Sequence, residues 1–255
     1  MKPGISVLVA VLAASFLSMP VYAVRERGRR DADAERKGSR LFLGLGDFLV
    51  HWFMWVLAPA EKLFLRLGLG PDVFNLGGLL FGLASGVLIG LGRLELGGWA
   101  IALAGVCDIL DGRIARARNL ASAYGKFIDS TLDRFVETFA FLGFALYLGS
   151  GPWPYGSLLA ATALAGSLLV SYAQARGESV GVSGSGGLMQ RAERLVLTCL
   201  ACLLDPVVSA GLGRPEGTLV IWVLGLVAAG AFGTAVYRTL WIAWTLRRRE
   251  GGPKG

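Results

Sequence analysis

The 255-residue chain is too apolar for a water-soluble globule, since 54% of its residues are hydrophobic, only 17% are charged and 37 are glycine. A mean hydropathy of +0.59 matches a polytopic helical membrane protein. The net charge of +7 does not indicate nucleic-acid binding, because the arginines are scattered at the ends of apolar runs; anionic lipid head groups are the better partner.

Residues 1–40 combine an apolar segment with a charged linker. The apolar segment, 5–23, ends in Val-Tyr-Ala and so resembles a secretory signal with a small residue at its cleavage site. Only Lys2 precedes this segment, whereas a run of arginines and a lysine follows it, and positive residues stay on the cytoplasmic side. We therefore favour an uncleaved anchor whose N-terminus lies outside. A cleaved signal and a start codon assigned too far upstream are the alternatives.

Residues 41–70 are predicted to form an interfacial amphipathic helix that lies in the plane of the membrane. Aromatic side chains such as Phe48, Trp52 and Trp55 are mixed there with charged residues, and Pro59 interrupts the pattern. Tryptophans mixed with charges are typical of the membrane interface rather than of its centre. An additional membrane span is the alternative, which the recurring charges disfavour.

Residues 71–246 contain apolar stretches that are each near the roughly 20 residues a helix needs to cross a bilayer. We expect membrane-spanning helices at 73–91, 97–117, 124–148, 155–175, 188–208 and 218–246. Glycine and alanine recur along these stretches, and small residues let membrane helices pack closely. The predicted fold is an all-α polytopic membrane protein with a bundle of about six transmembrane helices, followed by a basic cytoplasmic tail, 247–255.

The stretch 107–134, CDILDGRIARARNLASAYGKFIDSTLDR, places four aspartates in an apolar sequence. Asp108 and Asp111 are three positions apart and Asp129 and Asp133 four apart, so each pair projects from one face of a helix. An acidic side chain near the apolar part of a bilayer needs a partner, and Mg²⁺ or a related divalent cation takes oxygen ligands. The alternative partners are arginines of the same stretch: Arg113, Arg116, Arg118 and Arg134.

The spacing of this stretch resembles the signature of the CDP-alcohol phosphatidyltransferase family. Each defining position carries the residue that the signature requires: Asp108, Asp111, Gly112, Ala115, Arg116, Gly125, Asp129 and Asp133. The resemblance implies that the protein transfers a phosphatidyl group from CDP-diacylglycerol to an alcohol, in phospholipid biosynthesis, and releases CMP.

The resemblance also implies a role for each signature residue. Asp108, Asp111 and Asp129 are expected to bind Mg²⁺ or Mn²⁺, and Asp133 to share a ligand position. Asp133 is also the expected general base for the acceptor hydroxyl. The residues expected to line the CDP site are Gly112, Ala115, Arg116 and Gly125.

Two further polar patches, 171–181 and 187–194, interrupt the apolar stretches and resemble the branch of the family that uses inositol phosphate. An acceptor with its own phosphate needs a cationic pocket. The residues expected to form it are Arg176, Arg191 and Arg194. The branch has lysine where this chain has Gln174, so glycerol 3-phosphate, serine and other alcohols stay open as acceptors. Alternatively, the arginines anchor helix ends to lipid phosphates.

The distribution of basic residues predicts the orientation of the bundle. Most arginines lie on the side of the aspartates, whereas the opposite connections carry only Arg93 and Arg214. The aspartates of this integral protein of the cell (inner) membrane are therefore expected to face the cytoplasm. The expected partners are CDP-diacylglycerol, a small alcohol acceptor and membrane lipids, without nucleic acid, and the sequence leaves a homodimer open. One alternative is a scaffold that has lost catalysis, which the complete aspartate set disfavours. Another is an ion transporter, which is disfavoured because the aspartates lie at span ends and not at the membrane midplane.

Overall fold

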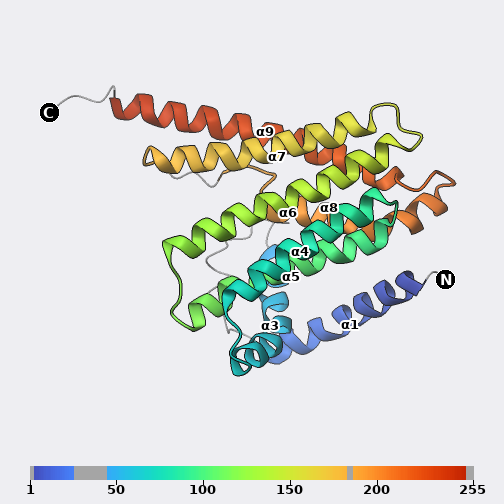
Figure 1. Cartoon of the computed structure of the whole chain (residues 1–255), viewed down its shortest axis with the longest axis horizontal. Helices are drawn as coiled ribbons and strands as arrows, with labels where there is room; N and C mark the ends of the chain where they lie inside the picture. The colour runs from blue at the N-terminus through green and yellow to red at the C-terminus, as the bar shows by residue number, and fades with distance from the viewer. Residues whose placement is uncertain (1–2, 26–44, 183–185, 251–255) are drawn as a thin grey trace. The chain divides into compact units, whose positions relative to one another are not determined.

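The computed structural model describes residues 3–25, 45–182 and 186–250, and all regular structure within these ranges is α-helical (Figure 1). The helices are α1 (Pro3–Arg25), α3 (Leu45–Arg66), α4 (Pro71–Gly90), α5 (Leu94–Ala117), α6 (Ala123–Gly149), α7 (Gly156–Ser179), α8 (Arg191–Gly211) and α9 (Thr218–Glu250). The all-α prediction is confirmed, and each predicted span corresponds to one helix from α4 to α9 with ends that differ by a few residues.

Two parts of the predicted domain organisation fall wholly or partly outside the described residues. The charged linker that follows the apolar N-terminal segment lies there almost entirely, and so does the end of the basic tail. The first residues of that tail belong to α9, which runs to Glu250. The apolar segment itself forms α1.

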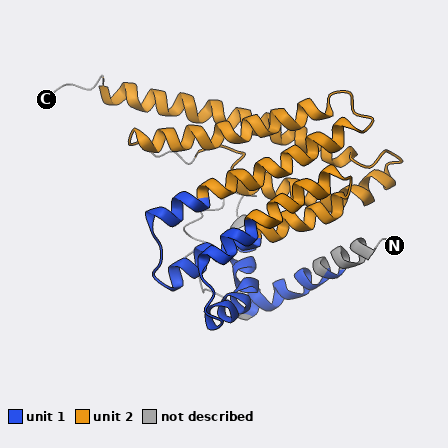
Figure 2. Cartoon of the chain, viewed as in Figure 1, with its two compact units in different colours: residues 1–78, 106–129 blue, residues 79–105, 130–255 orange. Residues whose placement is uncertain are grey.

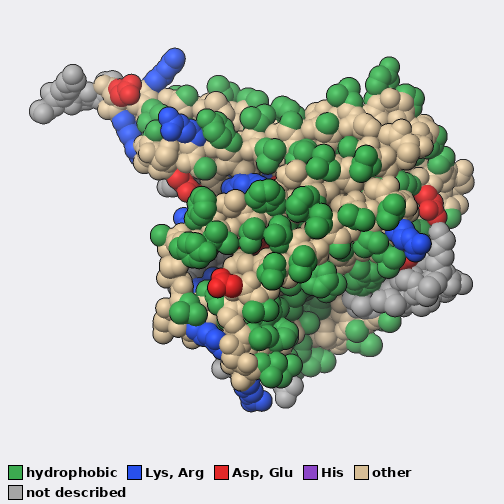
Figure 3. Space-filling view, viewed as in Figure 1, with side chains coloured by type: hydrophobic (Ala, Val, Ile, Leu, Met, Phe, Trp, Pro, Cys, Tyr) green, Lys and Arg blue, Asp and Glu red, His purple; other side chains and the backbone are tan. Residues whose placement is uncertain are grey.

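Within the part of the chain that the structure describes, five helices are long and apolar enough to cross a membrane: α3 over Phe48–Arg66, then α4, α7, α8 and α9. Helices α5 and α6 are not among them because the charged residues of the aspartate-rich stretch lie on these two helices. Hydrophobic side chains are exposed widely on the face seen in Figure 3, as expected for a surface that meets lipid. The chain is an integral membrane protein. That α3 lies in the membrane plane stays a prediction.

The chain divides into two compact units (Figure 2). The first comprises residues 1–78 and 106–129. Its core contains the buried side chains of Phe74, Leu110 and Ile114, with residues from the end of α3 packed against them. The end of α3 therefore lies directly on the segment of α5 that carries two of the aspartates.

Helix α1 packs against α3, where the Trp52 indole N–H donates to the Ser18 hydroxyl at 3.0 Å.

The second unit comprises residues 79–105 and 130–255. Helices α7 and α9 run side by side over much of their length, and α8 also packs against α9 (Figure 1). The fully buried carboxylate of Asp205 on α8 accepts hydrogen bonds from the backbone N–H groups of Gly217, Leu219 and Val220, at 2.6, 2.8 and 3.1 Å. These N–H groups at the start of a helix have no intrahelical partner, so the buried carboxylate fixes where α9 begins.

Glycine allows α4 and α6 to cross at close range within the second unit. A Cβ atom on Gly86 would overlap the Phe139 carbonyl, and one on Gly143 would overlap the Gly86 carbonyl. No side chain fits between the two backbones at this point. The crossing is an example of the small-residue contact by which membrane helices approach one another.

We expect Gly86→Ala to destabilise the protein, because the new methyl group meets backbone that cannot move without separating α4 from α6. Overpacking of this kind costs about 1–3 kcal/mol. Thermal unfolding of the detergent-solubilised protein would show a lower melting temperature. Gly225→Ala on α9 is the matched control, because nothing lies within 4 Å of a Cβ atom there. Equal melting temperatures for the two variants would contradict the close crossing.

Candidate functional site

Three aspartates of the first unit come together around one point. Asp108 and Asp111 lie on α5 and Asp129 on α6, and each offers a carboxylate oxygen such that these oxygens all lie within 4.8 Å of one another. Asp111 is buried, with 6% of its surface exposed, and the other two are partly buried. Carboxylates this close repel one another, and a hard divalent cation with oxygen ligands offsets that repulsion. The donor set therefore fits Mg²⁺ or Mn²⁺.

A short turn between α5 and α6 brings the third aspartate to the first two. Asn119 adopts a positive φ of 56°, and the Leu120 N–H donates to the Ala115 carbonyl at 2.8 Å, which ends α5. The Ser122 hydroxyl then accepts a hydrogen bond from the Gly125 N–H at 3.1 Å and so caps the start of α6. Asparagine tolerates the left-handed conformation better than most residues. The local sequence thus reverses the chain within a few residues.

The residues predicted to line a nucleotide site flank the aspartates on the same two helices. A Cβ atom on Gly112 would meet only the far end of the Arg116 side chain at 3.1 Å, and one on Gly125 would meet the Ser122 hydroxyl at 3.4 Å. The packing of the chain itself therefore does not demand glycine strictly at either position. Glycine here is consistent with room kept for a bound molecule, and the nucleotide role of these residues stays a prediction.

Helix α3 supports the aspartate-bearing part of α5 through contacts that the sequence did not reveal. The Arg113 Nε–H donates to a carboxylate oxygen of Glu61 at 2.6 Å, and the two side chains are only 10% and 15% exposed. Arg118 donates to the carbonyl oxygens of Leu65 and Gly68 at 3.2 and 3.0 Å. In the sequence, Glu61 is one of several charges on an aromatic helix, and nothing nearby indicates a partner 52 residues later.

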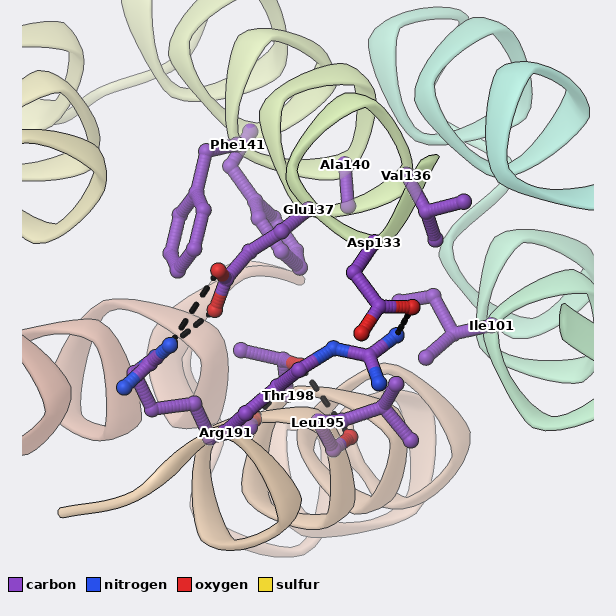
Figure 4. A pocket seen from close by; sticks show the side chains of 11 residues that line it. Ile101, Asp133, Val136, Glu137, Ala140, Phe141, Arg191, Leu195 and Thr198 are labelled. Carbon is purple, nitrogen blue, oxygen red and sulfur yellow. Dashed lines mark hydrogen bonds and ion pairs between the residues drawn. The ribbon is translucent and has the colours of Figure 1, made fainter. Parts of the chain in front are cut away.

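A second polar group lies within the second unit, around a cavity of about 20 Å³ between α6 and α8 (Figure 4). Asp133 lies one turn beyond Asp129 on α6. It forms an ion pair with Arg191 of α8, with 2.6 Å between the Arg191 Nη2 and Asp133 Oδ1 atoms. Arg194 pairs with Glu137 at the same short distance. The first pair is partly exposed, at 30% for Arg191 and 18% for Asp133. Sequence analysis missed Glu137, although it continues the four-residue spacing of the last two aspartates.

The three arginines predicted to bind the acceptor differ in their surroundings. Arg191 and Arg194 line the cavity beside Asp133. Arg176, near the end of α7, is exposed, does not line the cavity, and donates to the Ser179 hydroxyl at 3.4 Å. Gln174, at the position where the inositol-phosphate branch has lysine, accepts a hydrogen bond from Arg238 at 2.8 Å. The structure therefore brings together two of the three arginines.

Comparison with known proteins decides the family. The family model described as CDP-alcohol phosphatidyltransferase matches residues 69–241, which include the whole aspartate-rich stretch. The chain belongs to the CDP-alcohol phosphatidyltransferase family. As a family member, it is a transferase of phospholipid biosynthesis, and the resemblance seen in the sequence is confirmed.

The similar proteins include phosphatidylinositol phosphate synthases. The chain is 35% identical over 210 residues to the one from Streptomyces avermitilis, covering 81% of this chain and 84% of that protein. It also resembles the crystal structure of Mycobacterium tuberculosis phosphatidylinositol phosphate synthase with CDP-DAG bound, with 28% identity, a TM-score of 0.64, and coverage of 73% of this chain and 92% of that one. The same enzyme in complex with manganese and citrate matches with a TM-score of 0.64 and 28% identity over 73% of this chain and 88% of that one.

Glu61→Gln is expected to lower the free energy of unfolding by about 2 kcal/mol, since a largely buried ion pair loses one of its charges. Denaturation of the detergent-solubilised protein would measure the difference. Glu250→Gln, at the exposed end of α9, makes the same chemical change without a buried partner and serves as the control. If both variants unfold like the parent, the contact between α3 and α5 does not stabilise the protein.

Asp111→Asn is expected to weaken Mn²⁺ binding by at least about tenfold, because one of three anionic ligand groups becomes neutral. Electron paramagnetic resonance distinguishes free from bound Mn²⁺ and gives the affinity directly. Glu178→Gln removes one exposed carboxylate of α7 and is expected to leave the affinity unchanged. Equal affinities for Asp111→Asn and the parent would mean that the metal binds elsewhere.

Proposed function

We propose that this enzyme transfers the phosphatidyl group of CDP-diacylglycerol to an inositol phosphate and releases CMP. The observation that carries the proposal is the ion pair of Asp133 and Arg191 in the cavity between α6 and α8, where a carboxylate lies beside a cation. A hydroxyl that must lose a proton and a phosphate that must be neutralised need these two groups. The names of the similar synthases support the same acceptor.

Asp108, Asp111 and Asp129 are the proposed ligands of Mg²⁺ or Mn²⁺, with Asp133 sharing a ligand position. When bound, the cation neutralises the diphosphate of the lipid donor and stabilises departing CMP. The nucleotide would lie along Gly112, Ala115 and Gly125, with Arg116 directed at phosphate. This assignment uses the compact carboxylate group and the glycine positions beside it.

Asp133 is the proposed general base. Its carboxylate takes the proton of the acceptor hydroxyl while the hydroxyl oxygen forms a bond to the β-phosphorus and the bond from that phosphorus to the CMP oxygen breaks. Asp133 lies on the same face of α6 as Asp129, four residues earlier, so the base and a metal ligand share one helix. Arg191 would hold the acceptor phosphate beside the base.

Arg176 is proposed as a second cation for the acceptor, at the exposed end of α7. Its alternative role, contact with a lipid phosphate, fits the same exposure. The diacyl chains of the donor stay in the bilayer, and we propose that the site opens to the cytoplasmic face of the cell membrane, where the basic residues predominate. Gln174 stands where the inositol-phosphate branch has lysine and accepts a hydrogen bond from Arg238, so glycerol 3-phosphate and serine remain competing acceptors.

The test is CMP release by the purified protein from CDP-diacylglycerol with Mg²⁺ or Mn²⁺. Inositol 1-phosphate, inositol, glycerol 3-phosphate and serine are compared as acceptors. We expect release with inositol 1-phosphate, and a fall of about 10³-fold or more in kcat for Asp133→Asn. Release with serine or glycerol 3-phosphate alone would overturn the assignment of inositol phosphate as the acceptor, whereas the assignment of phosphatidyl transfer would stand. A folded protein that binds metal and releases no CMP with any acceptor would overturn the function itself.

A further inference from the structure

The most deeply buried guanidinium on α8 belongs to Arg194, whose side chain is 1% exposed. Its Nε and Nη2 donate to the two carboxylate oxygens of Glu137 at 2.6 and 3.2 Å, and its Nη1 donates to the Met189 carbonyl at 3.1 Å. The Glu137 side chain is only 12% exposed. This is the two-pronged geometry in which arginine binds carboxylate most strongly, and each guanidinium nitrogen already has an acceptor.

Arg194 is poorly placed to bind an acceptor phosphate. A phosphate would have to displace the Glu137 carboxylate, which would then keep its charge in a nearly dry site without its arginine. Removing one partner of a buried ion pair is strongly unfavourable. Arg191, by contrast, is 30% exposed and can turn toward a ligand from its contact with Asp133.

Two successive ion pairs connect α6 and α8. Asp133 and Glu137 are four residues apart on α6, and Arg191 and Arg194 are three apart on α8, so each pair of like side chains lies on one helix face. Figure 4 shows both carboxylates directed from one helix toward α8. Both ion pairs line the cavity, but the Arg194 side chain is only 1% exposed whereas that of Arg191 is 30% exposed. The ion pair of Glu137 and Arg194 fixes the register of α6 against α8 in which the ion pair of Asp133 and Arg191 forms.

The segment that enters α8 is held from its other side as well. The Met189 N–H donates to the Thr234 hydroxyl of α9 at 3.1 Å. Arg238 of α9 donates to the carbonyls of Gly186 and Val170 at 2.9 and 3.2 Å. With Arg194 bonded to the Met189 carbonyl, the first turn of α8 cannot shift without breaking several buried hydrogen bonds. Such support keeps a reacting group in place.

We propose that Glu137 and Arg194 are positioning residues. Their pair holds Arg191 against Asp133, and Arg191 rather than Arg194 meets the phosphate of the acceptor. This inference rests on the proposed function, since it concerns the acceptor side of the same reaction. It replaces the expectation that Arg194 is a ligand of the acceptor.

The test compares four variants by their kcat and their KM for inositol 1-phosphate: Arg191→Met, Arg194→Met, Glu137→Leu, and the double variant Glu137→Leu with Arg194→Met. Arg191→Met is expected to raise the acceptor KM at least about tenfold. Each single change of the buried pair leaves one charge without its partner, so kcat falls by about tenfold or more while the acceptor KM changes less than about threefold. The double variant buries no lone charge and is expected to recover most of the lost kcat.

The outcomes separate the two roles. A tenfold rise in acceptor KM for Arg194→Met and also for the double variant would overturn the inference, because the phosphate would then depend on Arg194 itself. A double variant with a kcat no better than the weaker single variant would overturn it too, since the pair would not act as a unit. Calorimetric titration with inositol 1-phosphate, independent of turnover, is expected to show binding to the parent and to the double variant. A parent protein that neither releases CMP nor binds inositol 1-phosphate would overturn the proposed function and this inference together; an active parent confines any failure to the inference.

Discussion

Burying charged side chains among apolar helices costs free energy unless each charge meets an opposite one, and this constraint organises both units of the molecule. In the first unit the Arg113 and Glu61 side chains pair at 2.6 Å between α5 and α3. In the second, two arginines of α8 pair with two carboxylates of α6 at the same distance. Each pair joins helices that are far apart in the sequence. These ion pairs therefore help to fix how the helices pack.

The carboxylates of Asp108, Asp111 and Asp129 form a compact group of like charges. Three acidic groups with oxygens within 4.8 Å of one another are a poor arrangement for a protein alone and a good one for a divalent cation. The membership of the chain in the CDP-alcohol phosphatidyltransferase family gives this arrangement its use. The cluster is therefore the candidate site for a divalent cation, and the ion pair between α3 and α5 joins the helix that carries two of its aspartates to a neighbouring helix.

Close backbone contact supplies the rigidity that such a site needs. Gly86 and Gly143 let α4 and α6 approach until no side chain fits between them, and the carboxylate of Asp205 fixes the first turn of α9. Arg238 of α9 then holds the segment that leads into α8. Helix ends and crossings that are fixed in this way can hold a reacting group to within a fraction of an ångström. Polar side chains outside the signature, such as those of Asp205 and Arg238, therefore hold helix ends and connecting segments in place.

The sequence by itself determined the helices and identified the aspartates of the candidate metal site. Long apolar runs separated by short polar connections define α4 to α9, and the intervals of three and four residues place each pair of aspartates on one face of its helix. These are local properties, so periodicity and spacing are enough to find them. The chemistry of the family followed from the same local stretch.

Only the tertiary structure decided which charges are partners. Glu61 pairs with a residue 52 positions away, and Glu137 with one 57 positions away. In the sequence Arg191 and Arg194 are equivalent cations on one helix, yet the Arg191 side chain is 30% exposed whereas that of Arg194 is 1% exposed and paired with Glu137. Helical spacing says which side chains share a face, but not which neighbouring helix that face meets. The packing of apolar surfaces between distant segments settles this.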